Sequence, residues 1–196
     1  MDKLTVFPDK EITSAGVVSD KFLSLGVKTF VDACFYLHEL PYGYNSSKDD
    51  LMIVFTEKMG TCTTKHSVIA TLAEELDLPV TKTICIYAMT EEIVTGTNAI
   101  LEKYNLPYVP MVHCFLEYDR FKVDLTEGNN NGKNRPIEEF LYTEKVNPHI
   151  SQKEEYLLYR KALEADILTR NEMKDIDMKI VLHAREEGIA LLKSKV

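Results

Sequence analysis

The hydrophobic positions in the first half of the chain repeat mostly at helical spacing, and polar turns separate the repeats. The pattern predicts a short helix over 18–25, ended by a glycine, and a longer helix over 27–40. Proline, glycine, asparagine and serine make 40–50 a loop, and 51–56 is too short to assign by its period. A third amphipathic helix runs over 62–76, where Asp-Leu-Pro stops it.

The middle of the chain changes to the pattern of strands. Residues 81–89 are rich in β-branched side chains and predict a buried strand, followed by a short helix over 97–105. Residues 111–126 predict a β-hairpin, and 127–136 is a polar loop. Because helices stand at both ends and strands between them, the fold class is α+β. The organisation that we expect is a core over 1–150.

Residues 151–196 predict a C-terminal helical extension packed on that core. The segment reads as two charged amphipathic helices with a break at 169–171. The apolar positions that recur at helical spacing, and that we expect to face inward, are Tyr156, Leu157, Leu163, Ile167, Ile176, Ile180, Val181, Ala184 and Ile189. These helices can pack on the core or form the surface of a homodimer, and the sequence leaves both open.

Composition and charge narrow the classes of function. The formal net charge is −8, and residues 1–150 carry all of it, with 14 basic against 22 acidic residues. An acidic domain without basic runs is not suited to nucleic acid or to an anionic membrane surface. The start, MDKLTVFPDK, does not resemble a secretion signal, and no apolar run has the length of a membrane span. We therefore expect a cytoplasmic protein whose four cysteines are reduced thiols.

One cysteine stands at a chemically special place. Thr61 is a good N-cap, which makes Cys62 the first residue of its helix. The first-turn N–H groups have no partner inside a helix, and the helix dipole favours a thiolate there. The same N–H can donate to an oxyanion, and Gly60 would let a substrate approach the backbone. The alternative interpretation is a small buried residue at a helix start.

The hairpin has a register that makes chemical sense on both faces. A two-residue turn after Tyr118 pairs Leu116 with Val123 on an apolar face. On the other face it pairs Glu117 with Lys122, a favourable pair of opposite charges. A slip by one residue would disrupt both faces, so we predict this register.

In that register His113 and Asp124 share a face as diagonal neighbours, roughly 7–8 Å apart at the backbone. An Asp124–His113 hydrogen bond would fix the tautomer of the imidazole and leave its other nitrogen for Cys62. The alternative is a solvated aspartate and an ordinary half-exposed histidine. The helix-start cysteine earlier in the same domain favours the catalytic interpretation.

These residues resemble the transglutaminase-like superfamily, within the wider papain-like cysteine fold. The matching motifs are GTCTTKHSVIATLAEEL, VHCFLEY and KVDLT, within residues 60–126. The resemblance places the family's thiolate, imidazole and aspartate on Cys62, His113 and Asp124. It implies a central antiparallel sheet packed, by the face that carries His113, against the cysteine helix, with extra N- and C-terminal helices.

The resemblance also implies an activity, which is thiol-based acyl transfer. The thiolate would attack an amide carbonyl, and water or an amine would resolve the covalent thioester. We favour a hydrolase acting on a peptide or other amide, without a cofactor, over a crosslinking transglutaminase.

The chain departs from the family pattern at the oxyanion donor. The family often has Trp two residues after the histidine, where this chain has Phe115, and the chain contains no Trp at all. Tyr44 or Asn45, in the loop before the cysteine, is our candidate donor. Thr61 and His66, next to Cys62 and on its helix face, complete the candidate site, with His66 expected to be a supporting residue rather than a catalytic one.

Two other functions compete with catalysis. Cys62, His66, His113 and Cys114 together form a suitable inventory for zinc. However, neighbouring strand residues such as His113 and Cys114 point to opposite sides of a sheet, so we expect no metal site. The other alternative is a catalytically idle member that serves as a binding module.

Overall fold

Two long antiparallel strands form the centre of the fold in the computed structural model, which describes residues 3–196. They are β1 (Thr81–Met89) and β2 (Val109–Tyr118), and they pair along their full length. The short strand β3 (Phe121–Val123) extends the sheet beyond β2, and β4 (Tyr142–Val146) extends it beyond β1. The order is therefore β3-β2-β1-β4, all antiparallel, and the predicted α+β class is confirmed.

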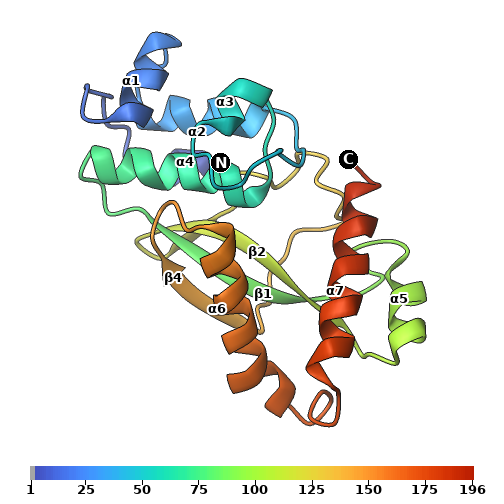
Figure 1. Cartoon of the computed structure of the whole chain (residues 1–196). Helices are drawn as coiled ribbons and strands as arrows, with labels where there is room; N and C mark the ends of the chain where they lie inside the picture. The colour runs from blue at the N-terminus through green and yellow to red at the C-terminus, as the bar shows by residue number, and fades with distance from the viewer. Residues whose placement is uncertain (1–2) are drawn as a thin grey trace.

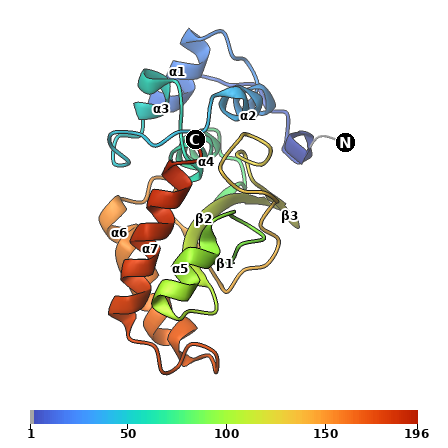
Figure 2. The ribbon, with the colours of Figure 1, turned by 90° about the vertical axis from the view of Figure 1, so that its right-hand side faces the viewer.

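The helices form two groups around this sheet (Figures 1 and 2). Helices α1 to α4 gather at one end of it, and α4 contacts both central strands. Helices α6 and α7 lie on one side, with α5 next to α7. None of the helices within residues 3–196 is long and apolar enough to cross a membrane. The helix bounds are α1 (Val17–Ser24), α2 (Phe30–Glu39), α3 (Ile53–Glu57), α4 (Cys62–Glu75), α5 (Thr97–Tyr104), α6 (Gln152–Ala165) and α7 (Met178–Lys193), with short 3-10 turns η1 (Lys3–Val6) and η2 (Ile167–Thr169).

The N-terminal helices follow the predicted pattern with one shift. The four residues expected to face inward from α2 are all buried, namely Phe30, Ala33, Cys34 and Leu37. The helix begins later than predicted because residues 27–29 are extended. Glu11 and Thr29 form an antiparallel bridge there, and Thr29 then caps the helix by accepting the N–H of Asp32 at 3.2 Å.

The predicted hairpin register is confirmed. Leu116 pairs with Val123 and Glu117 with Lys122, as the alternation of apolar and charged residues required. Strand β3 ends at Val123, so the chain leaves the sheet just before Asp124. This early end frees Asp124 from the ladder and lets its side chain turn toward the site.

The C-terminal helices pack on the sheet and build a second hydrophobic core there. The predicted inward phase is right for Leu163, Ile167, Val181 and Ala184, all of which are buried. It is wrong for Tyr156 and Leu157 of α6, which are exposed because Leu158 and Tyr159 take the inward positions of that helix. It is also wrong for Ile180 of α7, which is exposed. The Tyr159 hydroxyl donates to the carbonyl of Pro110 at 3.0 Å, which fixes the rotation of α6.

Candidate active site

The candidate nucleophile stands where the sequence placed it, at the first position of α4. Cys62 is 7% exposed, and Thr61 is its N-cap. The N–H of Thr61 donates to the hydroxyl of Thr64 at 3.0 Å, while the buried Thr61 hydroxyl has no partner within residues 3–196. The backbone N–H of Cys62 has no acceptor within the helix, as for any first-turn residue.

The turn before the cysteine is held by the loop that contains the candidate donors Tyr44 and Asn45. Tyr42 and Gly60 form a parallel bridge, and Gly60 donates its N–H to the carbonyl of Pro41 at 3.2 Å. A Cβ at Gly60 would lie 2.8 Å from the Thr64 hydroxyl. The glycine is therefore required for packing inside the protein, and a role for it in substrate approach stays a prediction.

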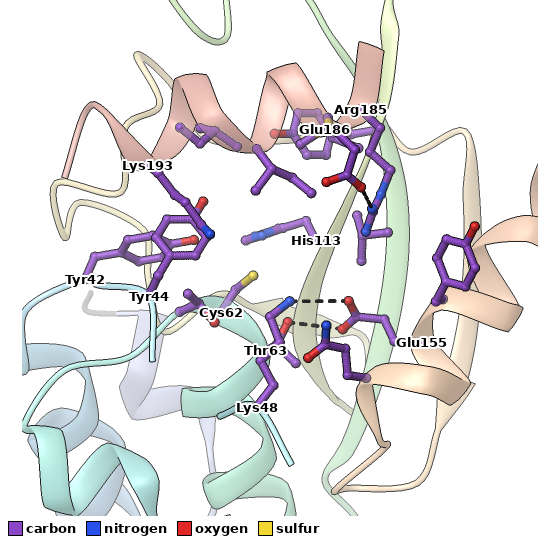
Figure 3. Close-up of a pocket in the computed structure, with 18 of the residues that line it drawn as sticks. Tyr42, Tyr44, Lys48, Cys62, Thr63, His113, Glu155, Arg185, Glu186 and Lys193 are labelled. Carbon is purple, nitrogen blue, oxygen red and sulfur yellow. Dashed lines mark hydrogen bonds and ion pairs between the residues drawn. The ribbon is translucent and has the colours of Figure 1, made fainter. Parts of the chain in front are cut away.

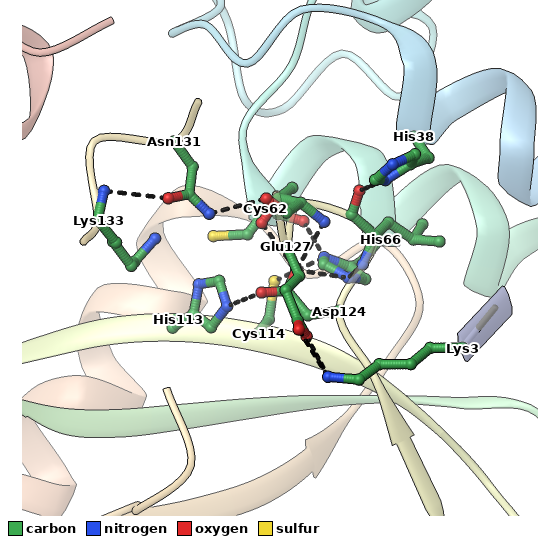
Figure 4. A network of polar contacts seen from close by, with 12 residues as sticks. Lys3, His38, Cys62, His66, His113, Cys114, Asp124, Glu127, Asn131 and Lys133 are labelled. Carbon is green, nitrogen blue, oxygen red and sulfur yellow. Dashed lines mark hydrogen bonds and ion pairs between the residues drawn. The ribbon is translucent and has the colours of Figure 1, made fainter. Parts of the chain in front are cut away.

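The predicted hydrogen bond between histidine and aspartate is present (Figure 4). His113 Nε2 lies 2.7 Å from Asp124 Oδ2. The other carboxylate oxygen accepts the N–H and the hydroxyl of Thr126, at 2.8 and 2.7 Å, so that the carboxylate is fixed. With Nε2 engaged by Asp124, the imidazole has Nδ1 left for Cys62. The structure thus brings Cys62, His113 and Asp124 together.

The charges of these groups support a thiolate next to an imidazolium. A hydrogen bond from the Cys114 thiol, and then the charge and hydrogen bond of His113, outweigh burial and hold the pKa of Cys62 well below its ordinary value. Burial lowers the pKa of His113, but the negative charges of Asp124 and Cys62 dominate and raise it to about 9. The pKa of Asp124 is lowered despite its burial, chiefly by His113.

Sequence reasoning named Cys114 only as a possible zinc ligand and missed its contact with Cys62. Cys114 belongs to the same small buried cluster as Cys62, and its sulfur lies 3.5 Å from His66 Nδ1. Burial raises the pKa of Cys114, so it stays protonated and can donate to the Cys62 thiolate. Alternation along β2 had suggested that His113 and Cys114 could not reach one site. Both contact Cys62 because the start of α4 lies against the strand itself.

His66 supports the site and does not line the cavity. Its Nδ1 lies 2.6 Å from the carbonyl oxygen of Cys62, and its Nε2 accepts the N–H of Leu125 at 2.9 Å. This pattern fixes a neutral tautomer, and burial lowers the pKa of His66 to about 4. The 3.5 Å approach of Nε2 to Asp124 Oδ1 is therefore not an ion pair. His66 links the nucleophile's helix to the segment that carries Asp124.

The geometry does not support Asn45 as an oxyanion donor, which corrects that expectation. Its amide nitrogen donates to Glu57 at 2.8 Å and to the carbonyl of Met59 at 3.0 Å. Its amide oxygen accepts the hydroxyl of Thr64 at 2.8 Å. Both ends of the amide are thus used to hold the loop against α4, and Asn45 does not line the cavity.

The candidate site opens into a cavity of about 630 Å³ (Figure 3). Figure 3 shows it between α7 and the first turn of α4, with Cys62 and His113 in its wall. Tyr44, which the sequence suggested, and Tyr42, which it did not, line one end. Burial raises the pKa of both tyrosines, that of Tyr44 to about 12, so both hydroxyls are protonated at neutral pH. Helix α7 also lines the cavity, which no sequence motif indicated.

The zinc alternative has no geometric support. Within residues 3–196, no group of three or more His, Cys, Asp or Glu side chains is arranged to hold a metal ion. Both nitrogens of His66 are engaged, and Nε2 of His113 is engaged by Asp124. The histidines that suggested a zinc site therefore form hydrogen bonds within the protein instead.

Comparison with known proteins gives no relative for this chain. Neither the scan against protein-family models nor the searches of curated proteins and of solved structures found a match.

Proposed function

We propose that this protein is a cysteine hydrolase of the transglutaminase-like, papain-like kind, which cleaves an amide bond through a covalent thioester. The carrying observation is the 2.7 Å hydrogen bond between His113 and Asp124, which leaves Nδ1 of the imidazole for Cys62 at a helix start. The cavity next to these groups has room for a small amide or a peptide segment.

In the first half of the reaction Cys62 is the nucleophile. Its thiolate attacks the amide carbonyl, and the carbonyl oxygen becomes an oxyanion. The imidazolium of His113 then gives its Nδ1 proton to the departing amine, the C–N bond breaks, and a thioester remains on Cys62. Asp124 keeps the imidazole in the correct tautomer and orientation throughout.

The oxyanion has donors at hand although the chain lacks a tryptophan. The backbone N–H of Cys62 is free of any intrahelical partner. Tyr44 lines the cavity with a protonated hydroxyl and takes the role of second donor. The Thr61 hydroxyl, which has no partner in the part of the chain that the structure describes, lies next to the nucleophile in the same wall.

In the second half of the reaction water resolves the thioester. Neutral His113 takes a proton from water, hydroxide attacks the thioester carbonyl, and the acid leaves as the Cys62 thiolate is regenerated. We assign hydrolysis rather than transamidation on the family resemblance of the motifs.

Iodoacetamide labelling of the native protein from pH 5 to 9, read for each cysteine by mass spectrometry, tests this proposal. Cys62 should label selectively, with an apparent pKa well below the value of about 8.5 for a free cysteine. Cys34 and Cys85 are internal controls, because burial raises the pKa of both thiols. Cys62→Ala should remove the labelled site and all amide cleavage, and His113→Ala should slow the labelling of Cys62 near neutral pH.

A different result would favour the binding module. If Cys62 labels no faster than the control cysteines, the site is idle and the cavity is a binding site only. If Cys62→Ala retains amide cleavage, another group performs the reaction and the mechanism above is wrong.

A further inference from the structure

The charges around the cavity are distributed unevenly. At one end, Lys48, Lys153 and Arg185 stand with Asp49, Glu155 and Glu186. Lys48 lies 3.6 Å from Glu155, and Arg185 lies 3.1 Å from Glu186. The three basic and three acidic groups at this end therefore balance.

The other end carries two lysines that have no acidic partner among residues 3–196. Lys193 lies over the ring of Tyr44, with its nitrogen 5.1 Å from the ring centroid, and Lys133 lies 5.7 Å over the ring of Tyr42. Neither lysine forms a salt bridge within residues 3–196. In a chain of net charge −8, two unneutralised ammonium groups at one end of a cavity are unusual and favour an anionic ligand.

The two lysines come from segments that are locked together. Lys133 follows Gly132, which has φ +78° and packs so closely on the end of α7 that a Cβ would lie 3.1 Å from that of Lys195. Asn131 is buried and anchors the loop by donating to the carbonyl of Thr126 at 2.8 Å. The backbone N–H of Lys133 donates in turn to Asn131 Oδ1 at 3.1 Å. The position of Lys133 relative to α7 and Lys193 is thus built into the fold.

The wall of the cavity also holds a buried tyrosine hydroxyl. Tyr87 is 1% exposed and lines the cavity, and its hydroxyl has no hydrogen-bond partner within residues 3–196. A buried hydroxyl without a partner is costly, so a ligand that accepts from it is expected to bind there. Lys133 is close enough to the nucleophile for its charge to act on both Cys62 and His113.

We propose that the substrate is an amide that carries a carboxylate, which Lys133 and Lys193 bind while its amide lies at Cys62. The inference rests on the proposed function and deepens it, because it names the chemical class of the substrate. Two ammonium groups from separate elements bind the carboxylate between them, and the balanced end of the cavity takes the uncharged remainder of the substrate.

Two alkylating reagents of nearly the same size test the charge preference. Iodoacetate carries a carboxylate and iodoacetamide does not, and both form a C–S bond to Cys62 with loss of iodide. The ratio of their rate constants cancels any change in the pKa of Cys62. We expect Lys133→Gln and Lys193→Gln each to lower the iodoacetate-to-iodoacetamide ratio by about three- to tenfold relative to the unaltered protein. Lys133→Arg and Lys193→Arg should retain it.

A matched control separates a local effect from the change in net charge. Lys179→Gln removes one positive charge from the exposed face of α7, outside the cavity, and should leave the ratio unchanged. If Cys62 reacts readily with iodoacetamide but the ratio is the same in all variants, the substrate inference is wrong and the proposed function stands. If Cys62 is inert to both reagents, the proposed function fails and the inference fails with it.

Cleavage of paired peptides tests the inference on true amides. Each pair differs only in Glu against Gln or Asp against Asn next to the scissile bond. The unaltered protein should cleave the acidic member with the higher kcat/KM, and Lys193→Gln should reduce that preference, with the loss falling mainly on KM. Equal kcat/KM for both members of every pair would overturn the inference without touching the catalytic mechanism.

Discussion

At the scale of single residues, the pKa of Cys62 is lowered by two neighbours of different kinds. His113 supplies a positive charge, and Cys114 supplies a hydrogen bond from a thiol that burial keeps protonated. The helix start adds a free N–H and a favourable dipole. Cys114, which stays protonated, thus lowers the pKa of Cys62.

Cys114 can be tested without disturbing His113. Cys114→Ala removes the hydrogen-bond donor, so the apparent pKa of Cys62 from iodoacetamide labelling should rise. Cys114→Ser keeps a donor of similar size and should restore most of the effect. Cys85→Ala, a buried thiol on the neighbouring strand, is the control. If the unaltered protein and the three variants show the same pH profile of Cys62 labelling, Cys114 has no part in stabilising the thiolate.

Asp124 should matter more for turnover than for alkylation. Asp124→Asn disturbs the tautomer and orientation of His113, so amide cleavage should fall about a hundredfold or more, while the rate of Cys62 alkylation falls much less. Asp119→Asn is the matched control, because Asp119 is exposed in the hairpin turn, where its φ of 52° suits asparagine. Equal losses in the two assays would contradict an orienting role.

At the scale of elements, α7 belongs to the site as well as to the core. It packs on the sheet through Gly188, where a Cβ would lie 2.9 Å from the Cε of Met89 and 3.1 Å from the Sδ of Met111. The same helix carries Arg185 and Lys193 into the cavity wall. The close approach at Gly188 thus brings α7 against Met111, which also lines the cavity.

A larger side chain at Gly188 should lower the stability of the protein and change the rate at which Cys62 is labelled. Gly188→Leu forces the two methionines aside and should destabilise the protein by about 1–3 kcal/mol, measured by urea unfolding. Because Met111 also lines the cavity, the rate of Cys62 labelling should change as well. Ala190→Leu, on the exposed face of α7, should change neither quantity. If the urea midpoint of unfolding is unchanged in Gly188→Leu, α7 can shift on the sheet without loss of stability.

At the scale of the whole molecule, the site lies between two hydrophobic cores. One core joins α1–α4 to the end of the hairpin, and the other joins the sheet to α5–α7. Cys62 and Cys114 belong to a third, small cluster together with Leu158 of α6. His66, completely buried, connects this region to the chain after β3.

Stability should fall in acid partly because of His66. Its pKa is about 4 in the folded protein, against an ordinary value of 6.5. Well above pH 6.5 the imidazole is neutral in both states and contributes no pH dependence. As the pH falls from 6.5 to 4, only the unfolded chain takes up this proton, so stability is lost, by about 2 to 3 kcal/mol in total.

Comparing the unaltered protein with the His66→Gln variant isolates the contribution of His66 to the pH dependence of stability. His66→Gln is expected to be less stable at every pH, but its free energy of unfolding should fall less between pH 7.5 and pH 4.5. Proton uptake by groups distant from His66 occurs in both proteins and cancels in the difference. Parallel curves of stability against pH would show that His66 does not titrate in this range.

The sequence by itself determined the elements whose signals are local. The cap at Thr61 and the apolar period fixed the start of α4, and the alternation on both faces fixed the hairpin register. That register also predicted the His113–Asp124 contact, because the two residues are only eleven apart in the chain. Strand β4 carried too weak a pattern to be predicted, since it is a short edge strand with half-buried and exposed positions.

Only the tertiary structure decided what surrounds these three residues. Cys114 reaches Cys62 because α4 packs across β2, a contact between segments far apart in sequence that no local period encodes. Asn45 holds its loop against α4 instead of lining the cavity, because its hydrogen-bond partners Glu57 and Thr64 come from other elements. The charge of the cavity likewise depends on the packing of α7 beside the loop of Lys133. Periodicity and caps act within a few residues, whereas a cavity forms where distant surfaces meet, so its lining is fixed only when the chain folds.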